Sequence, residues 1–141
     1  MAKSQDSLTD YFKSISTITI LNSGQKLSFF KGDDKFELIF SELISITNNS
    51  HDMPAFAVSL HDETIKELAT GIWVELGFNE TQTFREMPFD TLLFSLKENN
   101  TGLNLIRKHN GKYEGRCFYL NLNKNFNDLI KLSLKFFNTY F

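Results

Sequence analysis

Cysteine is almost absent from this sequence, since Cys117 is the only one among 141 residues. A disulfide within the chain is therefore excluded, and nothing points to an oxidising compartment. Proline and glycine are also scarce, with two and seven residues. Because linkers are usually rich in these residues, no boundary between domains stands out. We expect a single domain over residues 1–141.

Long apolar runs are missing as well. No stretch approaches the roughly 18–20 apolar residues that a membrane-spanning helix needs. The amino-terminal segment also lacks the apolar core of a secretory signal peptide. We therefore expect a cytoplasmic protein that has no membrane partner.

The sequence carries none of the common motifs for cofactor binding or nucleophilic catalysis. It contains neither GxxxxGK[ST] nor GxGxxG, the two glycine-rich loops that hold phosphate groups, and no G-x-S-x-G. No cofactor is predicted. Cys117 would need a nearby base to act as a nucleophile, so we expect it to be a small buried residue.

Two His-Asp pairs are the only pattern that suggests a metal. His51-Asp52 and His61-Asp62 are ten residues apart and carry ligand types suited to zinc, manganese or iron. Both pairs fall at a predicted loop or helix start, where Asp is expected as a cap. Neighbours on an extended chain also point in opposite directions. We assign no metal site, and whether the four side chains converge is left open.

Apolar and aromatic residues, by contrast, are plentiful. Hydrophobic residues make up 41% of the chain, and 15 residues are Phe. Phe has no polar atom to satisfy, so most of these rings should be buried. The chain can therefore form a core without a disulfide or a metal.

The first half of the sequence predicts an alternation of helices and strands. Leu8, Tyr11, Phe12 and Ile15 have helical spacing, whereas 17–20 is a run of β-branched residues. The expected elements are a helix over 7–15, strands 17–20 and 26–30 around the turn 22–24, a helix over 34–44, a loop over 48–54, a strand over 55–60 and a helix over 62–69.

From residue 72 the apolar pattern changes to a period of two, which indicates strands. The expected elements are a strand over 72–78, a turn at 79–81, strands 83–87 and 91–97, a turn at 99–102, a hairpin of 103–109 with 112–120, and an amphipathic helix from about 125. Short turns favour antiparallel pairing. The sequence thus predicts an α+β domain with a mainly antiparallel sheet of about five to seven strands, helices on one face and a C-terminal amphipathic helix.

Asn110-Gly111 is the strongest local signal, because a two-residue type I′ turn needs positive φ at both positions. Such a turn sets the register of the hairpin, with opposed residue numbers adding to 221. Arg107 should then face Glu114, Leu105 should face Arg116, and Leu103 should face Phe118. In the same register Cys117 faces Asn104.

Charged residues within the predicted sheet are the candidates for a binding site. Arg107, Glu114 and Arg116 share a hairpin face with apolar residues, and Glu75 lies opposite the apolar face of its own strand. Such charges either form ion pairs at the sheet rim or line a cleft for a carboxylate or phosphate. We name these four residues as candidate ligand-binding residues.

The C-terminal segment has more aromatic residues than one helix face can hide. Phe136, Phe137, Tyr140 and Phe141 fall within six residues. Surplus apolar surface suggests contact with a protein partner or a second copy of the chain. The alternative is a terminal helix that is buried on two sides.

Charge is unevenly distributed. Residues 1–96 contain 7 Lys/Arg and 14 Asp/Glu, and residues 97–141 contain 8 and 3, so that balances of −7 and +5 give the net −2. The two segments either pack together and partly neutralise one another or present a basic surface to an acidic partner. The sequence pI near 5.9 argues against nucleic acid.

Two hypotheses of function remain. The first is a small non-catalytic binding protein, such as an immunity protein or another partner-binding module, that acts through a charge-polarised surface. The second is a small enzyme or ligand-binding domain whose Arg/Glu/His-lined cleft takes an anionic ligand. The sequence does not decide whether the protein is an enzyme, because catalytic groups are assembled in space.

Overall fold

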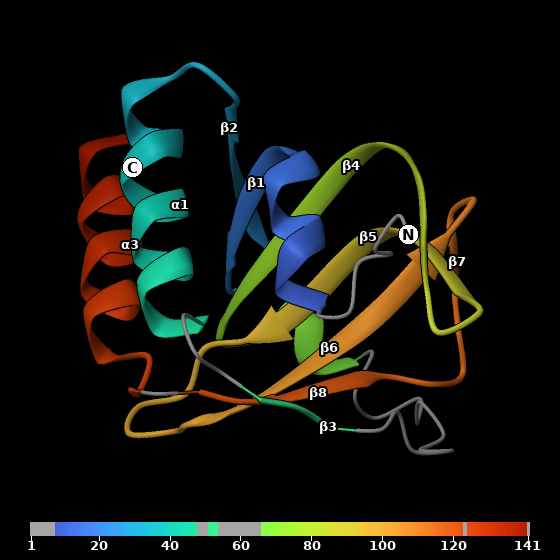
Figure 1. Cartoon of the computed structure of the whole chain (residues 1–141). Coiled ribbons are helices and arrows are strands. Elements are labelled where there is room, and N and C mark those ends of the chain that lie inside the picture. Colours follow the sequence, from blue (N-terminus) through green and yellow to red (C-terminus); the bar gives the residue numbers. More distant parts are fainter. Residues whose placement is uncertain (1–7, 48–50, 54–65, 123, 141) are drawn as a thin grey trace.

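The computed structural model describes residues 8–47, 51–53, 66–122 and 124–140 (Figure 1). Its elements are η1 Leu8–Ser14, β1 Ile15–Asn22, β2 Gln25–Phe30, α1 Asp34–Thr47, β3 His51–Met53, η2 Glu67–Ala69, β4 Ile72–Phe84, β5 Met87–Ser95, β6 Gly102–His109, β7 Lys112–Tyr113, β8 Phe118–Asn121 and α3 Asn127–Tyr140. The two η elements are short 3₁₀ helices.

One antiparallel sheet forms the centre of the fold. Its strands follow the order β2-β1-β4-β5-β6-β8-β3, and the two-residue β7 pairs with β6. Helices α1 and α3 lie side by side against one face (Figure 1). The predicted α+β class, antiparallel sheet and C-terminal helix are confirmed.

The main core lies between this sheet face and the helices. Alternate strand residues such as Ile18, Leu76 and Leu105 are fully buried there together with Phe36 of α1. The Phe126 ring stacks on Phe94, with 5.8 Å between ring centroids. Burial of these large side chains supplies most of the favourable free energy of folding.

The N-terminal helix is shorter and tighter than predicted. It is a 3₁₀ helix that ends at Ser14, and Ile15 already belongs to β1. Leu8 and Phe12 are buried as the apolar spacing indicated. The Tyr11 hydroxyl donates a hydrogen bond of 2.6 Å to the carbonyl of Thr83, which fixes this helix to β4.

The predicted turn at Asn79-Glu80-Thr81 is wrong, because β4 continues through it to Phe84. The β4–β5 pairing shifts between Gly77 and Gln82, so the polar residues form an irregular, largely exposed part of a strand.

The actual turn between β4 and β5 consists of Arg85 and Glu86. Their φ angles are 51° and 67°, in the left-handed region that is costly for residues with a Cβ atom. A two-residue hairpin turn of type I′ requires this conformation at both positions. The Arg85 guanidinium lies over the Phe84 ring, 4.9 Å from its centroid.

The predicted loop over 48–54 is also partly wrong, since His51–Met53 form β3 and pair with β8. A three-residue strand that contains two polar residues gives little signal in a sequence. The predicted strand over 55–60 lies outside the described residues. Of the helix predicted over 62–69, the structure describes the 3₁₀ turn Glu67–Ala69.

The Asn110-Gly111 turn is confirmed. Both residues have positive φ, and His109 pairs with Lys112 in the predicted register. The backbone N–H of Glu114 also donates to the carbonyl of Arg107, as predicted.

Beyond Glu114 the predicted register is wrong by two residues. Leu105 pairs with Phe118, and Leu103 with Leu120, whereas Arg116 and Phe118 were expected. The extra residues form a bulge between β7 and β8, and Gly115 is the only sequence signal for it. Cys117 consequently does not face Asn104, which pairs with Tyr119.

None of the helices in the described part of the chain is long and apolar enough to cross a membrane.

The strained turn predicts that Glu86→Gly stabilises the protein. Glycine adopts φ near 67° without a Cβ penalty, so we expect the free energy of unfolding to rise by about 0.5–1 kcal/mol. Urea denaturation measures this change. Glu98→Gly is the control, because exposed Glu98 has no positive φ and the change should lower the stability or leave it unaltered. A lower stability of Glu86→Gly would contradict the strain argument.

Candidate functional site

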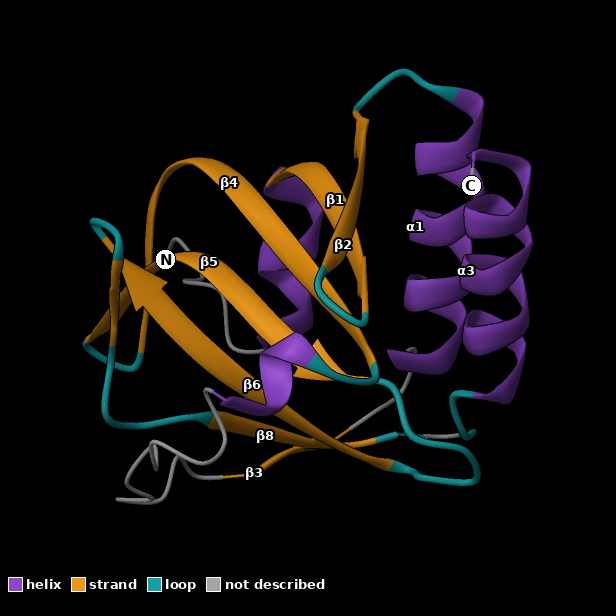
Figure 2. Ribbon diagram, turned by 180° about the vertical axis from the view of Figure 1, so that it is seen from behind, coloured by secondary structure: helices purple, strands orange, loops and turns teal. Residues whose placement is uncertain are grey.

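The sheet face opposite α1 and α3 carries a second, smaller apolar cluster. It consists of Leu21, Trp73, Leu93, Ile106 and Cys117, all buried. The 3₁₀ helix η2 lies over this face (Figure 2), and its Leu68 packs against the cluster. This face is therefore partly apolar.

Trp73 joins η2 to the sheet. Its indole N–H donates to the carbonyl of Glu67 at 3.1 Å and to that of Thr70 at 3.2 Å. The ring itself is only 4% exposed, so it is a rigid wall. Glu67 is thereby held above the sheet surface.

The β5–β6 hairpin opens beside Trp73. These two strands pair at only three positions, which end at Leu93 and Ile106. The next rung of the ladder would join Ser95 to Asn104, and it is not made. On its other edge β6 pairs with β8 over Gly102–Leu105. The two strands therefore separate toward the Lys97–Asn100 turn.

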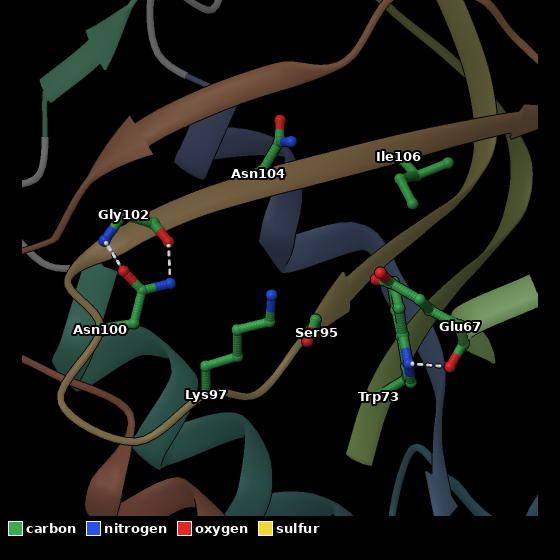
Figure 3. A pocket seen from close by; sticks show the side chains of 8 residues that line it. All are labelled: Glu67, Trp73, Ser95, Lys97, Asn100, Gly102, Asn104 and Ile106. Atoms are coloured by element: carbon green, nitrogen blue, oxygen red, sulfur yellow. Dashed lines mark hydrogen bonds between the residues drawn. The ribbon is translucent and has the colours of Figure 1, made fainter. Parts of the chain in front are cut away.

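A depression of about 220 Å³ lies where the strands separate. We call it the β5–β6 groove; Figure 3 shows its eight lining residues, Glu67, Trp73, Ser95, Lys97, Asn100, Gly102, Asn104 and Ile106. Trp73 and Ile106 give it apolar walls, and Lys97 extends into it (Figure 3). An adjoining depression of about 330 Å³ shares Glu67, Trp73, Ser95 and Lys97.

Asn100 shapes one end of the groove. Its side-chain amide donates to the carbonyl of Gly102 at 3.0 Å, and its amide oxygen accepts from the Gly102 N–H at 3.1 Å (Figure 3). A Cβ at Gly102 would overlap the Tyr119 hydroxyl, so a larger residue there would require the Tyr119 side chain to move. Hydrogen bonds thus fix the shape of this end of the groove.

The groove offers several groups that can bind a ligand. It combines one carboxylate, one ammonium, two carboxamides and a hydroxyl, and it has no imidazole or thiol. Across the described residues no three His, Cys, Asp or Glu side chains gather as a metal site would require. Asp52 and the two histidine positions 51 and 61 have no described side chains, so the question of their convergence stays open.

Of the four candidate ligand-binding residues, Arg107 is buried, and its guanidinium already donates hydrogen bonds within the chain. It is 4% exposed, and its guanidinium donates to the carbonyls of Arg116 at 2.9 Å and Pro88 at 2.7 Å. It also lies over the Phe118 ring on the main-core side. Burial lowers the pKa of Arg107, while Glu114 acts in the opposite direction.

The other three candidates lie apart from one another. Glu75 is half-buried on the face that carries Trp73, whereas Arg107 is on the opposite face. Glu114 is half-buried and Arg116 is exposed in the bulge. Burial, and secondly Glu75, raises the pKa of the Tyr113 hydroxyl. The structure does not bring these four residues around one cavity, and none of them lines the β5–β6 groove.

The predicted partner-contact residues divide between core and undescribed positions. Phe136 and Phe137 are 4% and 3% exposed, and the Phe136 ring packs edge-on against Phe29. Both rings therefore belong to the core of this chain. The Tyr140 side chain and Phe141 lie outside the described residues, so their contact with a partner stays a prediction.

Sequence reasoning missed the groove residues because they come from three separate segments. Ser95, Asn100 and Asn104 are ordinary polar residues in the sequence. The one available signal is the period of two over 72–78, which places Trp73 on the same strand face as Glu75, opposite Val74 and Leu76.

Comparisons with known proteins yielded no matching family model, no similar curated protein and no similar solved structure.

Arg107→Met should destabilise the fold. The change leaves the carbonyls of Pro88 and Arg116 without their donor, and we expect the free energy of unfolding to fall by about 2 kcal/mol. Urea denaturation measures it. Arg116→Met removes an exposed guanidinium and should change the stability by less than about 0.5 kcal/mol. Equal effects of the two variants would contradict the assigned role.

Cys117 should be unreactive in the folded protein. It is 5% exposed, and burial raises the pKa of its thiol, although Arg107 opposes the shift. The thiolate is the reacting species, so we expect the reaction with Ellman's reagent to be at least about a hundredfold slower than in urea-unfolded protein. The unfolded thiol also ionises first, so stability should fall as the pH rises past about 8.5. Similar rates in both states would contradict this burial.

Proposed function

We propose that this chain is a non-catalytic binding protein whose binding site for a protein partner is the β5–β6 groove with its charged rim. One observation carries the proposal: the hairpin opens beside a rigid tryptophan and leaves hydrogen-bonding groups turned into a shaped depression. Concave sites with apolar walls and a few fixed polar groups are typical of ligand recognition.

The charge distribution supports a charged partner surface. Glu67 comes from the acidic part of the chain, and Lys97 is the first residue of the basic part. Both side chains are exposed at the groove, so opposite charges flank it. Such an arrangement favours one orientation of a partner and speeds its association more than it adds affinity. An immunity protein or a similar partner-binding module needs such fast association in one defined orientation.

The chemistry of the described residues favours binding over catalysis. The thiol of Cys117 is buried with a raised pKa, and the His109 ring lies at a hairpin tip, 3.4 Å from the Thr81 hydroxyl. The second hypothesis, an anionic ligand in an Arg/Glu/His cleft, needs a free Arg107. Its guanidinium already serves two carbonyls of its own chain.

Photo-crosslinking in the cells of origin tests the proposal. Benzoylphenylalanine at the exposed position Asn104 should give a discrete protein adduct, because this residue lines the groove. The same photoreactive residue at Lys131, exposed on α3, is the matched control and should not give that adduct.

Competition makes the result specific to the groove. Excess unlabelled protein should suppress the adduct, whereas excess Asn104→Arg protein should not, since its longer charged side chain fills the groove. The proposal fails if position 131 yields the same adduct, or if both competitors suppress it equally.

A further inference from the structure

Alternate residues of β6 point their backbone N–H and C=O groups toward β5 and the groove. The carbonyl of Thr101 accepts a hydrogen bond from the Leu122 N–H, and that of Arg107 accepts one from the Glu114 N–H. The backbone N–H and C=O groups of odd-numbered β6 residues therefore point toward β8 and β7. Gly102, Asn104 and Ile106 therefore face β5. Ile106 pairs with Leu93, but no ladder pair joins Asn104 to Ser95 on this edge of β6. On the other edge Asn104 lies opposite Tyr119.

The chain itself shows which chemical group fits such a site. At Gly102, one rung further along, the Asn100 carboxamide takes the place of a neighbouring strand. It donates through nitrogen and accepts through oxygen at 3.0 and 3.1 Å (Figure 3). A primary carboxamide thus satisfies both backbone groups of one β6 residue at once.

We propose that the β5–β6 groove binds a primary carboxamide, which fills the missing rung between Ser95 and Asn104. Its NH₂ group donates to the Asn104 carbonyl and its oxygen accepts from the Asn104 N–H, with the Ser95 backbone opposite. This inference rests on the proposed function and names the chemistry that the site recognises. A carboxylate cannot replace the carboxamide, because it has no hydrogen to donate.

The size and walls of the groove fit a glutamine or asparagine side chain. A volume of about 220 Å³ is below the roughly 300 Å³ at which pockets for drug-sized ligands begin. Trp73 and Ile106 give apolar contact for the methylene groups of the ligand. The exposed charges of Glu67 and Lys97 suit an ammonium and a carboxylate, so the carboxamide has two sources: a free amino acid or a side chain on a polypeptide.

NMR titration of the ¹⁵N-labelled full chain tests this inference. The probes are free L-glutamine and N-acetyl-L-glutamine N′-methylamide, and the matched control is N-acetyl-L-glutamate N′-methylamide. We expect one or both glutamine probes to shift the backbone amide signals of Ser95 and Asn104 saturably. The glutamate compound should bind at least about tenfold more weakly, because it leaves the Asn104 carbonyl unpaired.

The variants Lys97→Gln and Glu67→Gln distinguish the two sources of the carboxamide. A stronger response to free glutamine that both variants weaken supports a free amino acid. An equal or stronger response to the capped compound that neither variant changes supports a side chain on a polypeptide. Both side chains are exposed, so both variants should fold.

The carboxamide inference is overturned if neither glutamine probe moves the Ser95 and Asn104 signals at millimolar excess. It is also overturned if the glutamate compound shifts them equally. If these probes fail while the groove-specific photo-adduct at position 104 still forms, the inference fails and the proposed function stands.

Discussion

The sharing of strand β6 between two partners is the constraint on which the rest of this structure depends. β6 pairs with β5 through Ile106, Arg107 and Lys108, and with β8 through Gly102–Leu105. These two pairings lie on opposite edges of β6 and cover different residues, so the edge that faces β5 has no ladder partner beyond Ile106. The β5–β6 groove and the β7–β8 bulge are the two consequences, one on each side of β6.

Arg107 stabilises the β7–β8 bulge. A bulge leaves backbone groups without ladder partners, and a buried carbonyl without a donor costs about 1–3 kcal/mol. The Arg107 guanidinium donates to the carbonyl of Arg116 in the bulge and to that of Pro88 at the start of β5. One side chain thus connects β5 and the bulge across β6. Its burial follows from this role, whereas an exposed ligand-binding arginine would need a free guanidinium.

Local patterns in the sequence predicted most of the fold, because period and turn chemistry are local properties. Asn110-Gly111 identified its hairpin since both residues tolerate positive φ. Arg85 and Glu86 also have positive φ, but neither is Asn or Gly. The sequence therefore placed the turn in the polar run 79–81 instead. The β7–β8 bulge was likewise hidden, because a shift of two residues preserves the alternation of apolar side chains. The groove residues come from separate segments that only the tertiary fold brings together, so they could not be grouped from the sequence.

Strand β2, at one end of the strand order, is poorly suited to pairing with a further strand. The Phe30 N–H donates to the Asp33 carboxylate at 3.1 Å, and the Phe30 carbonyl accepts from the Asp33 N–H at 3.0 Å. Asp33 therefore occupies the outward hydrogen-bonding groups at the end of β2, and exposed Lys26 lies nearer its start. Blocked ends and lysine on an edge both oppose the addition of another strand.

The energetics of the groove determine what kind of complex it can support. Each hydrogen bond that replaces water adds only about 0.5–1.5 kcal/mol, so the two bonds of a carboxamide add about 1–3 kcal/mol. A millimolar complex already needs about 4 kcal/mol, and a nanomolar one about 12 kcal/mol. The remainder must come from apolar contact with Trp73 and Ile106 and from surface outside the groove. The proposed function therefore requires, for a tight complex, a partner that covers the rim around Glu67 and Lys97; in the proposed complex the groove selects which side chain the partner inserts.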